Sequence, residues 1–342
     1  MNKKLFKSKN ELINFLIKTK NVNPSTIQDS AFNEKTYTSL ITPYTCLVAD
    51  GINSKTGKKI YSFSLDFNLF LECNIIDGNI SNCLYIYISA FEKRIRNFVI
   101  ETVCLKLRND NDELCVNVRR FDDYINGKPL FDFLCVTDTP SLRRRIIKAN
   151  QIIDDEQRLK ELEKIKYIKN IIISKRKDSF NALIHSVDKS KNKKSSLENH
   201  YCEKYGFIPL YIGMHRLTFG ELLSIYSVFS IKDKNVFMQG YYHNKSHIFS
   251  ENDAFKFESR IKRINDIRNI VAHNEPIIPL IINDKKITGL LSIFEKLKNN
   301  YNHCVCKSAN SICIPKFSVV KKNIFNKRYF EKIENVIDVL NT

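Results

Sequence analysis

The stretch INDIRNIVAHNEPII, Ile264 to Ile278, places an arginine, an asparagine and a histidine close together in the chain. A guanidinium binds phosphate oxygens in a fixed fork and stays positively charged. An imidazole titrates near neutrality and can therefore accept or donate a proton during a reaction. If Arg268, Asn269 and His273 converge, they could act on an RNA phosphate, whose neighbouring 2′-hydroxyl is already a nucleophile. Cleavage by that route needs no metal and leaves a 2′,3′-cyclic phosphate and a 5′-hydroxyl end.

A helix must position these three side chains. Apolar residues step along it by three or four positions and predict a buried stripe, formed by Phe257, Ile261, Ile264, Ile267 and Val271. Arg268 and His273 are about 140° apart on a regular helix, whereas Asn269 and His273 share a face. The three side chains therefore converge only if the helix bends or ends near His273. Asn274 and Pro276 indicate an end there.

A purely structural role for the same residues is the alternative. Arg268 could form a salt bridge to a neighbouring helix. His273 could lie at a helix C-terminus, where a cation interacts favourably with the helix dipole. The spacing alone favours this structural interpretation, so the motif by itself is only a hypothesis.

The composition predicts a mainly helical, basic protein. Only 9 Gly and 8 Pro among 342 residues argue against a turn-rich β-protein, and 43% hydrophobic residues allow a sizeable core. The net charge of +18 suits a polyanion such as nucleic acid, although a general bias toward Lys and Asn also explains it. No stretch resembles a signal peptide or a transmembrane helix, and the 10 Cys show no disulfide spacing. We therefore expect a cytoplasmic protein that does not contact a membrane.

One segment, HCVCKSANSIC, could suggest a metal site. It contains His303, Cys304, Cys306 and Cys313. Zinc sites usually pair cysteines as C-x-x-C, and Cys304 and Cys306 are one residue closer than that. We expect no metal and no other cofactor, and the sequence leaves zinc binding by these four residues open.

Local signals place most of the helices. Three pairs with the spacing of a capping box predict helix starts: Ser8 with Glu11, Thr218 with Glu221, and Ser250 with Asp253. Further helices are predicted from Ser25, over residues 33–49 and from Asn326. The run Asp77-Gly78-Asn79 predicts a break, after which residues 80–107 form a long core helix.

The predicted organisation is an N-terminal helical region (1–78), a core (79–280) and a basic C-terminal region (281–342). The highly charged segment at about 141–200 has almost no helix breakers, so we expect a long helical insertion, as one helix or a hairpin. A polar linker is predicted over residues 188–200. Minor β elements are expected: residues 55–67 fit either a short strand pair or a loop leading into a helix, and short strands could form near 311–320.

Three segments, in order, resemble the Abi-like abortive-infection family of the AbiD and AbiF type. RNIVAHNEP, from Arg268, resembles the R-N-x-x-x-H signature of the HEPN ribonucleases in that family. ISAFEKRIRNFVIE resembles an upstream helix with a Glu-x-x-x-Arg pair, here Glu92 and Arg96. IPLYIGMHRLTFGELLSIY resembles a PLW…SFG segment, with Tyr211 in place of the tryptophan. Together the three segments are more specific than any one of them.

This resemblance implies a HEPN-like helical bundle, usually paired as a homodimer. It implies a metal-independent endoribonuclease of phage defence or of a toxin–antitoxin system, with RNA as substrate and a small regulatory RNA as a further partner. Arg268, Asn269 and His273 would be the catalytic residues. Glu92 and Arg96 would support Arg268 or His273, whereas the structural alternative is an ordinary ion pair within one helix.

Several basic runs could bind RNA phosphates, with a solvated helix face as the structural alternative for each. The residues are Arg143, Arg144, Arg145, Lys175, Arg176, Lys177, Lys327 and Arg328. Together they predict an RNA affinity that falls steeply with salt. Two other functions stay open: a HEPN-like protein that holds a small structured RNA without cutting it, and a basic interaction protein in which Arg268 and His273 are structural.

Overall fold

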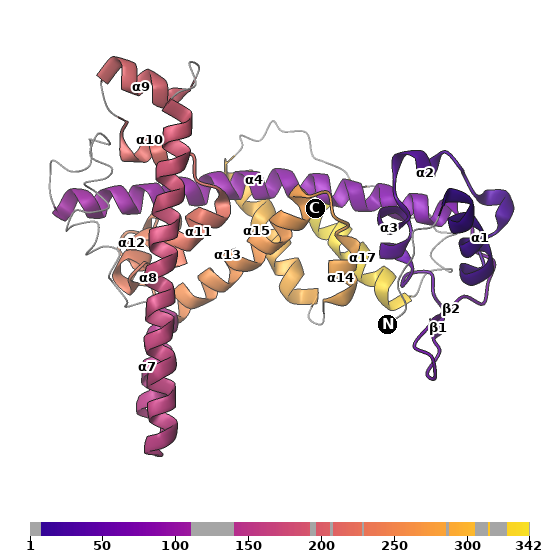
Figure 1. The fold of residues 1–342 in the computed structure, drawn as a ribbon, viewed down its shortest axis with the longest axis horizontal. Coiled ribbons are helices and arrows are strands. Elements are labelled where there is room, and N and C mark those ends of the chain that lie inside the picture. The colour runs from indigo at the N-terminus through magenta and orange to yellow at the C-terminus, as the bar shows by residue number, and fades with distance from the viewer. Residues whose placement is uncertain are drawn as a thin grey trace. The chain divides into compact units, whose positions relative to one another are not determined.

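The computed structural model of the chain is mainly α-helical, as its composition predicted (Figure 1). The structure describes residues 8–110, 140–191, 196–205, 208–227, 229–284, 287–304, 314 and 327–341. It divides into two compact units, one formed by Met1–Phe91 with Asp266–Thr342 and the other by Glu92–Asn265. Among the residues that the structure describes, no helix is long and apolar enough to cross a membrane. The domain boundaries after residues 78 and 280 stay a prediction.

All three predicted capping signals begin helices. These helices are α1 (Lys9–Lys20), α11 (Phe219–Ser227) and α13 (Glu251–Ala272). In each case the hydroxyl oxygen of Ser8, Thr218 or Ser250 accepts a backbone N–H three residues later. The acidic side chain at that position accepts the backbone N–H of the Ser or Thr in return. These contacts satisfy N–H groups that have no partner within the helix.

The prediction of a helix starting at Ser25 is wrong. The chain forms only a 3-10 turn, η1 (Pro24–Thr26), and Asn23 caps it by accepting the N–H of Ser25. Ile27 then adopts an extended conformation, which stops any continuation.

The single helix predicted over residues 33–49 is also wrong. Three short helical segments occupy this region: α2 (Ala31–Glu34), α3 (Tyr37–Leu40) and the 3-10 turn η2 (Thr42–Tyr44). Lys35 is extended and Thr36 caps α3, so the chain restarts where a continuous helix was expected. Pro43 removes a backbone donor and limits the next segment to one turn.

A two-stranded antiparallel sheet follows, formed by β1 (Gly51–Ile52) and β2 (Lys59–Ile60). Of the two alternatives left open for residues 55–67, the strand pair is the one formed, although its first strand lies before residue 55. The second expected element, near 311–320, lies outside the described residues apart from Ile314.

The long helix α4 (Asn68–Asp110) passes straight through Asp77 and Gly78, so the predicted break is wrong (Figure 1). Asp77 is buried, and its carboxylate accepts the backbone N–H groups of Ile277 and Ile278 instead of capping a local turn. A glycine inside a helix costs only about 1 kcal/mol. Burial of the apolar side chains around it outweighs that cost; these are Cys73, Ile76, Ile80, Cys83 and Leu84.

Three helices complete the first unit: α14 (Ile278–Asn283), α15 (Ile287–Cys304) and α17 (Lys327–Asn341). The last of them confirms the helix predicted from Asn326. α17 packs against both α14 and α15, and α14 also packs against η2. Their shared core is apolar and includes Ile281, Leu290, Phe294, Leu297, Ile333 and Ile337. Lys332 of α17 donates to the carbonyl oxygens of Ile282 and Asp284 at the end of α14.

The charged segment of the second unit is a helical hairpin, which is one of the two arrangements that the sequence left open. It consists of α7 (Pro140–Asn150) and α8 (Asp155–Lys191), which pack together around Leu142, Ala149 and Ile165 (Figure 1). The predicted linker over residues 188–200 is partly helical, because α8 extends to Lys191 and α9 (Leu197–Tyr205) begins soon after. α8 also packs against α9, α11 and the short helix α10 (Leu210–Met214).

α12 (Ile231–Tyr241) and α13 enclose a buried ion pair in this unit. Lys234 is fully buried, and its Nζ lies 2.6 Å from Glu258 Oε2 and 3.2 Å from the carbonyl oxygen of Ser227. Glu258 also pairs with the exposed Lys262 at 2.7 Å. The buried lysine is tolerated because it has two acceptors within hydrogen-bond distance.

Candidate functional site

α13 ends at Ala272, where the sequence predicted an end. Asn274 has a left-handed φ of 54°. The N–H of Asn274 donates to the carbonyl of Val271 at 3.1 Å, and the N–H of Glu275 donates to that of Ile270 at 2.9 Å. This pair of bonds is a Schellman motif, which turns the chain sharply away from the helix axis. The predicted apolar stripe of α13 is buried along its whole length.

His273 is still held by the last turn of α13. Its N–H donates to the carbonyl oxygen of Asn269 at 3.0 Å, so His273 lies one turn beyond Asn269. The side chains of Asn269 and His273 are exposed, and Arg268 is half-buried. Arg268 Nη1 lies 3.4 Å from Asn269 Oδ1. Neighbouring residues are about 100° apart around a helix, and the arginine side chain is long enough to reach Asn269 across that angle.

Asn269 therefore lies at the centre of the group: it contacts Arg268 and is one turn from His273. The exposed end of α13 thus carries a permanently charged guanidinium (Arg268), an amide (Asn269) and an imidazole (His273). A guanidinium and an imidazole are both groups that can act on a phosphodiester. Their catalytic role stays a prediction.

Asp77 fixes the segment that follows His273, a role that the sequence analysis missed. Its Oδ1 accepts the N–H of Ile278 at 2.6 Å, and its Oδ2 accepts the N–H of Ile277 at 3.2 Å. Both isoleucines are completely buried. The chain is therefore held at two neighbouring amides shortly after the Schellman turn. One sequence signal could have found Asp77: it interrupts the buried face of α4, where a carboxylate needs donors.

The Asp77 carboxyl has a perturbed acidity. Burial raises its pKa to about 6, although hydrogen bonds from the two isoleucine amides and from Tyr44 partly oppose that rise. Asn74 Nδ2 donates to Tyr44 Oη at 3.2 Å, and burial, with a smaller effect of Asp77, raises the pKa of Tyr44. Lys35 also donates to Asn74. These four residues form a polar cluster inside the first unit.

Glu92 and Arg96 form the predicted ion pair on α4, with 3.0 Å between Arg96 Nη2 and Glu92 Oε1. Arg96 Nη1 also donates to the carbonyl oxygens of His215 at 3.0 Å and Leu217 at 2.5 Å. The guanidinium thus caps carbonyl groups at the end of α10. The predicted support of Arg268 or His273 by this pair stays a prediction.

The arginine run of α7 makes contacts within the second unit. Arg143 pairs with Glu251 at 2.8 Å, and Arg145 pairs with Glu161 at 3.4 Å. Arg144 lies over the ring of Phe255, 4.2 Å from its centroid. These contacts give all three arginines a structural role, and their binding of RNA stays a prediction.

The remaining predicted residues lie beyond what the structure describes in side-chain detail. Lys175, Arg176 and Lys177 belong to α8, and Lys327 and Arg328 begin α17, but their side chains lie outside the described part. The side chains of the four candidate zinc ligands, His303, Cys304, Cys306 and Cys313, lie outside it too. Among the described residues, no group of His, Cys, Asp and Glu side chains could hold a metal ion.

A family model described as Abi-like protein matches residues 32–279, which is more than half of the chain. The match includes the three segments that the sequence analysis singled out, around Arg96, Tyr211 and His273. Comparisons with curated proteins and with solved structures gave no match.

Proposed function

The chain belongs to the Abi-like protein family, and on that premise we propose that it is a metal-independent endoribonuclease. The family implies a role in abortive infection, a defence against phage. The observation that carries the proposal is the group of Arg268, Asn269 and His273 at the exposed end of α13. The HEPN-like core and the AbiD or AbiF type are part of the same proposal.

The proposed chemistry uses the ribose 2′-hydroxyl as nucleophile. His273 accepts the proton of that hydroxyl as the oxygen attacks the neighbouring phosphorus. Arg268 binds the non-bridging phosphate oxygens and stabilises the charge that develops on them. The bond to the 5′-oxygen breaks, and this oxygen takes up a proton. In this mechanism Asn269, whose Oδ1 lies 3.4 Å from Arg268 Nη1, helps to orient the guanidinium toward the phosphate.

We also propose that the protein acts as a homodimer. Proton removal from the 2′-hydroxyl and proton delivery to the 5′-oxygen are separate tasks. A second copy would bring a second His273 to one phosphate, so that each imidazole performs one task. A small structured RNA is a further proposed partner, either as substrate or as regulator.

The test is cleavage of a mixed RNA pool with EDTA present, comparing wild type with Arg268→Ala and His273→Ala. The wild type is expected to cut and to leave 2′,3′-cyclic phosphate ends. Each variant is expected to lose at least about 100-fold in rate, His273→Ala because it removes an acid–base group and Arg268→Ala because it removes a group that stabilises the developing charge. Both should still bind RNA, because the rest of the basic surface is unchanged.

Arg158→Ala is the matched control for the loss of one positive charge. Arg158 is an exposed arginine of α8 that pairs with Asp155 at 2.6 Å. Its loss should leave cleavage within about 2-fold, since one surface ion pair contributes little. If the wild type binds RNA tightly and never cuts, the protein is instead a non-cleaving RNA-binding protein that acts by sequestration. RNA affinity that hardly changes between low and physiological salt would contradict both functions.

A further inference from the structure

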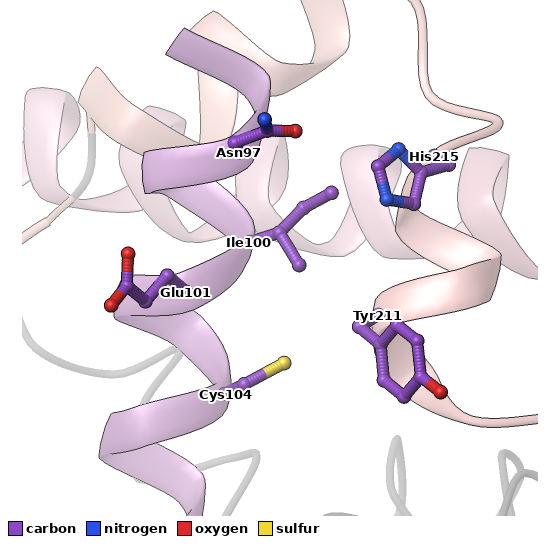
Figure 2. Close-up of a pocket in the computed structure, with 6 residues that line it drawn as sticks. All are labelled: Asn97, Ile100, Glu101, Cys104, Tyr211 and His215. Carbon is purple, nitrogen blue, oxygen red and sulfur yellow. The ribbon is translucent and has the colours of Figure 1, made fainter. Parts of the chain in front are cut away.

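The second unit contains a cavity of about 340 Å³ between α4 and α10 (Figure 2). The residues that line it are Asn97, Ile100, Glu101 and Cys104 of α4, Tyr211 of α10, and His215 directly after α10. This volume lies at the small end of the range of about 300–1,000 Å³ that is usual for small-molecule pockets. The cavity therefore suits a ligand of the size of one nucleoside.

Its walls have the chemistry of a slot for a flat ring. Figure 2 shows Ile100 and Cys104 pointing from α4 toward His215 and Tyr211, so that an aliphatic wall faces two rings. Asn97 lies at one end of the slot and offers an amide. An apolar slot between rings and aliphatic groups favours a stacked aromatic ligand, and the amide can hydrogen-bond to its edge.

Two further tyrosines continue the aromatic surface outside the slot. The hydroxyl oxygens of Tyr201 and Tyr211 lie 3.3 Å apart, and the rings of Tyr201 and Tyr205 have centroids 5.5 Å apart. Tyr205 is 50% exposed and Tyr211 is 42% exposed. Lys204 Nζ lies 5.1 Å from the Tyr205 ring centroid and adds a positive charge beside this surface.

The backbone of His215 is anchored, and burial favours the neutral form of its side chain. Arg96 donates to its backbone carbonyl at 3.0 Å, which ties the end of α10 to α4. Burial, together with the nearby Arg96 guanidinium, lowers the pKa of His215 below its ordinary value of 6.5. A neutral imidazole has one N–H donor and one acceptor nitrogen, the pair of groups that the edge of a nucleobase complements.

From these contacts we propose that the cavity is a subsite for one unpaired RNA base, stacked on Tyr211 and contacted at its edge by Asn97 and His215. A phosphate does not suit the cavity, because its walls are mostly apolar and none of the residues that line it is a lysine or an arginine. Beside the cavity lies a row of three tyrosines, of which Tyr205 and Tyr211 are exposed, together with Lys204. That row matches the stacking platforms of proteins that bind single-stranded nucleic acid. The inference rests on the proposed function only for the choice of RNA as the polymer.

The chain contains no tryptophan, so Tyr211→Trp introduces a single fluorophore into the slot. The experiment uses the full chain with His273→Ala added, so that RNA is bound and not cut. Single-stranded oligonucleotides of each base are titrated with EDTA present. Stacking of a base on the introduced indole is expected to quench its fluorescence with saturation. Tyr85→Trp, at an exposed tyrosine of the first unit, is the matched control and should show no comparable quenching.

Affinity provides the second measurement. Tyr211→Ala is expected to weaken the binding of single-stranded RNA by roughly 5- to 150-fold, as the loss of one stacked base does elsewhere. Tyr211→Trp should stay within a few-fold of wild type, because indole preserves the stacking surface. The same substitutions should leave binding of a fully paired RNA duplex unchanged, since its bases are not available.

Two results would overturn the proposal. One is unchanged affinity of Tyr211→Ala for single-stranded RNA. The other is an indole that RNA does not quench, including the case in which a peptide with Phe and Leu side chains does quench it. The proposed function is tested separately by the cleavage assay. If the protein cuts RNA but no base binds in the slot, only the proposal of a base-binding slot is refuted. Conversely, RNA could quench the indole while the protein that retains His273 cuts no RNA. That result would support the slot and refute the ribonuclease.

Discussion

Asp77→Ala tests whether one carboxylate holds the chain that follows His273. In the wild type, both oxygens of Asp77 accept a buried backbone N–H, from Ile277 at 3.2 Å and from Ile278 at 2.6 Å. A hydrogen bond to a charged group contributes about 1.5–3 kcal/mol. Since 1.4 kcal/mol corresponds to a factor of ten, each amide should exchange its hydrogen roughly 10- to 150-fold faster in the variant.

The effect on global stability should be much smaller. The pKa of Asp77 is raised from 3.8 to about 6, so the ionised carboxylate carries a net penalty in the folded state. A shift of that size corresponds to about 3 kcal/mol, and it is the net cost that remains after the two backbone hydrogen bonds have offset part of the penalty of burial. The free energy of unfolding is therefore expected to change by less than about 2 kcal/mol, although the local exchange rates change greatly.

Hydrogen–deuterium exchange of the peptide that spans residues 275–282 measures this effect. Asn74→Ala is the matched control, because Asn74 lies one turn earlier on α4 and donates to Tyr44, not to the isoleucine amides. In Asn74→Ala, the amides of residues 275–282 should exchange at the same rate as in the wild type. If Asp77→Ala also keeps wild-type protection there, Asp77 is not the acceptor of these amides. Under the proposed function, Asp77→Ala should also slow RNA cleavage while RNA binding persists, because the segment after His273 loosens.

Three further predictions follow from single contacts. The raised pKa of Asp77 means that its contribution to stability is complete below its ordinary pKa of 3.8 and is lost as the pH rises through about 6. Denaturant titrations of wild type and Asp77→Asn should therefore differ by about 1 kcal/mol more in favour of wild type at pH 5 than at pH 7. Lys234→Met leaves Glu258 without its 2.6 Å partner and should cost about 3 kcal/mol or more, whereas Lys262→Met, at the exposed partner, should cost less than about 1 kcal/mol. Asn274→Val forces a β-branched residue into a φ of 54° and should lower the melting temperature by the equivalent of about 1–2 kcal/mol, while Asn274→Gly should be nearly neutral.

Local signals in the sequence predicted the helix boundaries that matter most for the site. The start of α13 at Ser250 and its end before Asn274 were both read from residue types and spacing. Capping boxes and Schellman turns join atoms within five residues of each other, so the chain specifies them without help from distant partners. The same local reasoning placed Asn269 and His273 on one face of α13.

Tertiary structure decided what local spacing could not. Asp77-Gly78 has the residue types of a turn, yet α4 continues through it, because the carboxylate is used by amides 200 and 201 residues further along the chain. Arg96 likewise reaches the carbonyl oxygen of His215, 119 residues away. Buried polar groups must find partners wherever packing brings them, and packing is a property of the whole chain. The sequence alone determined which side chains could do chemistry on a phosphate, and the fold decided how the segment beside them is held.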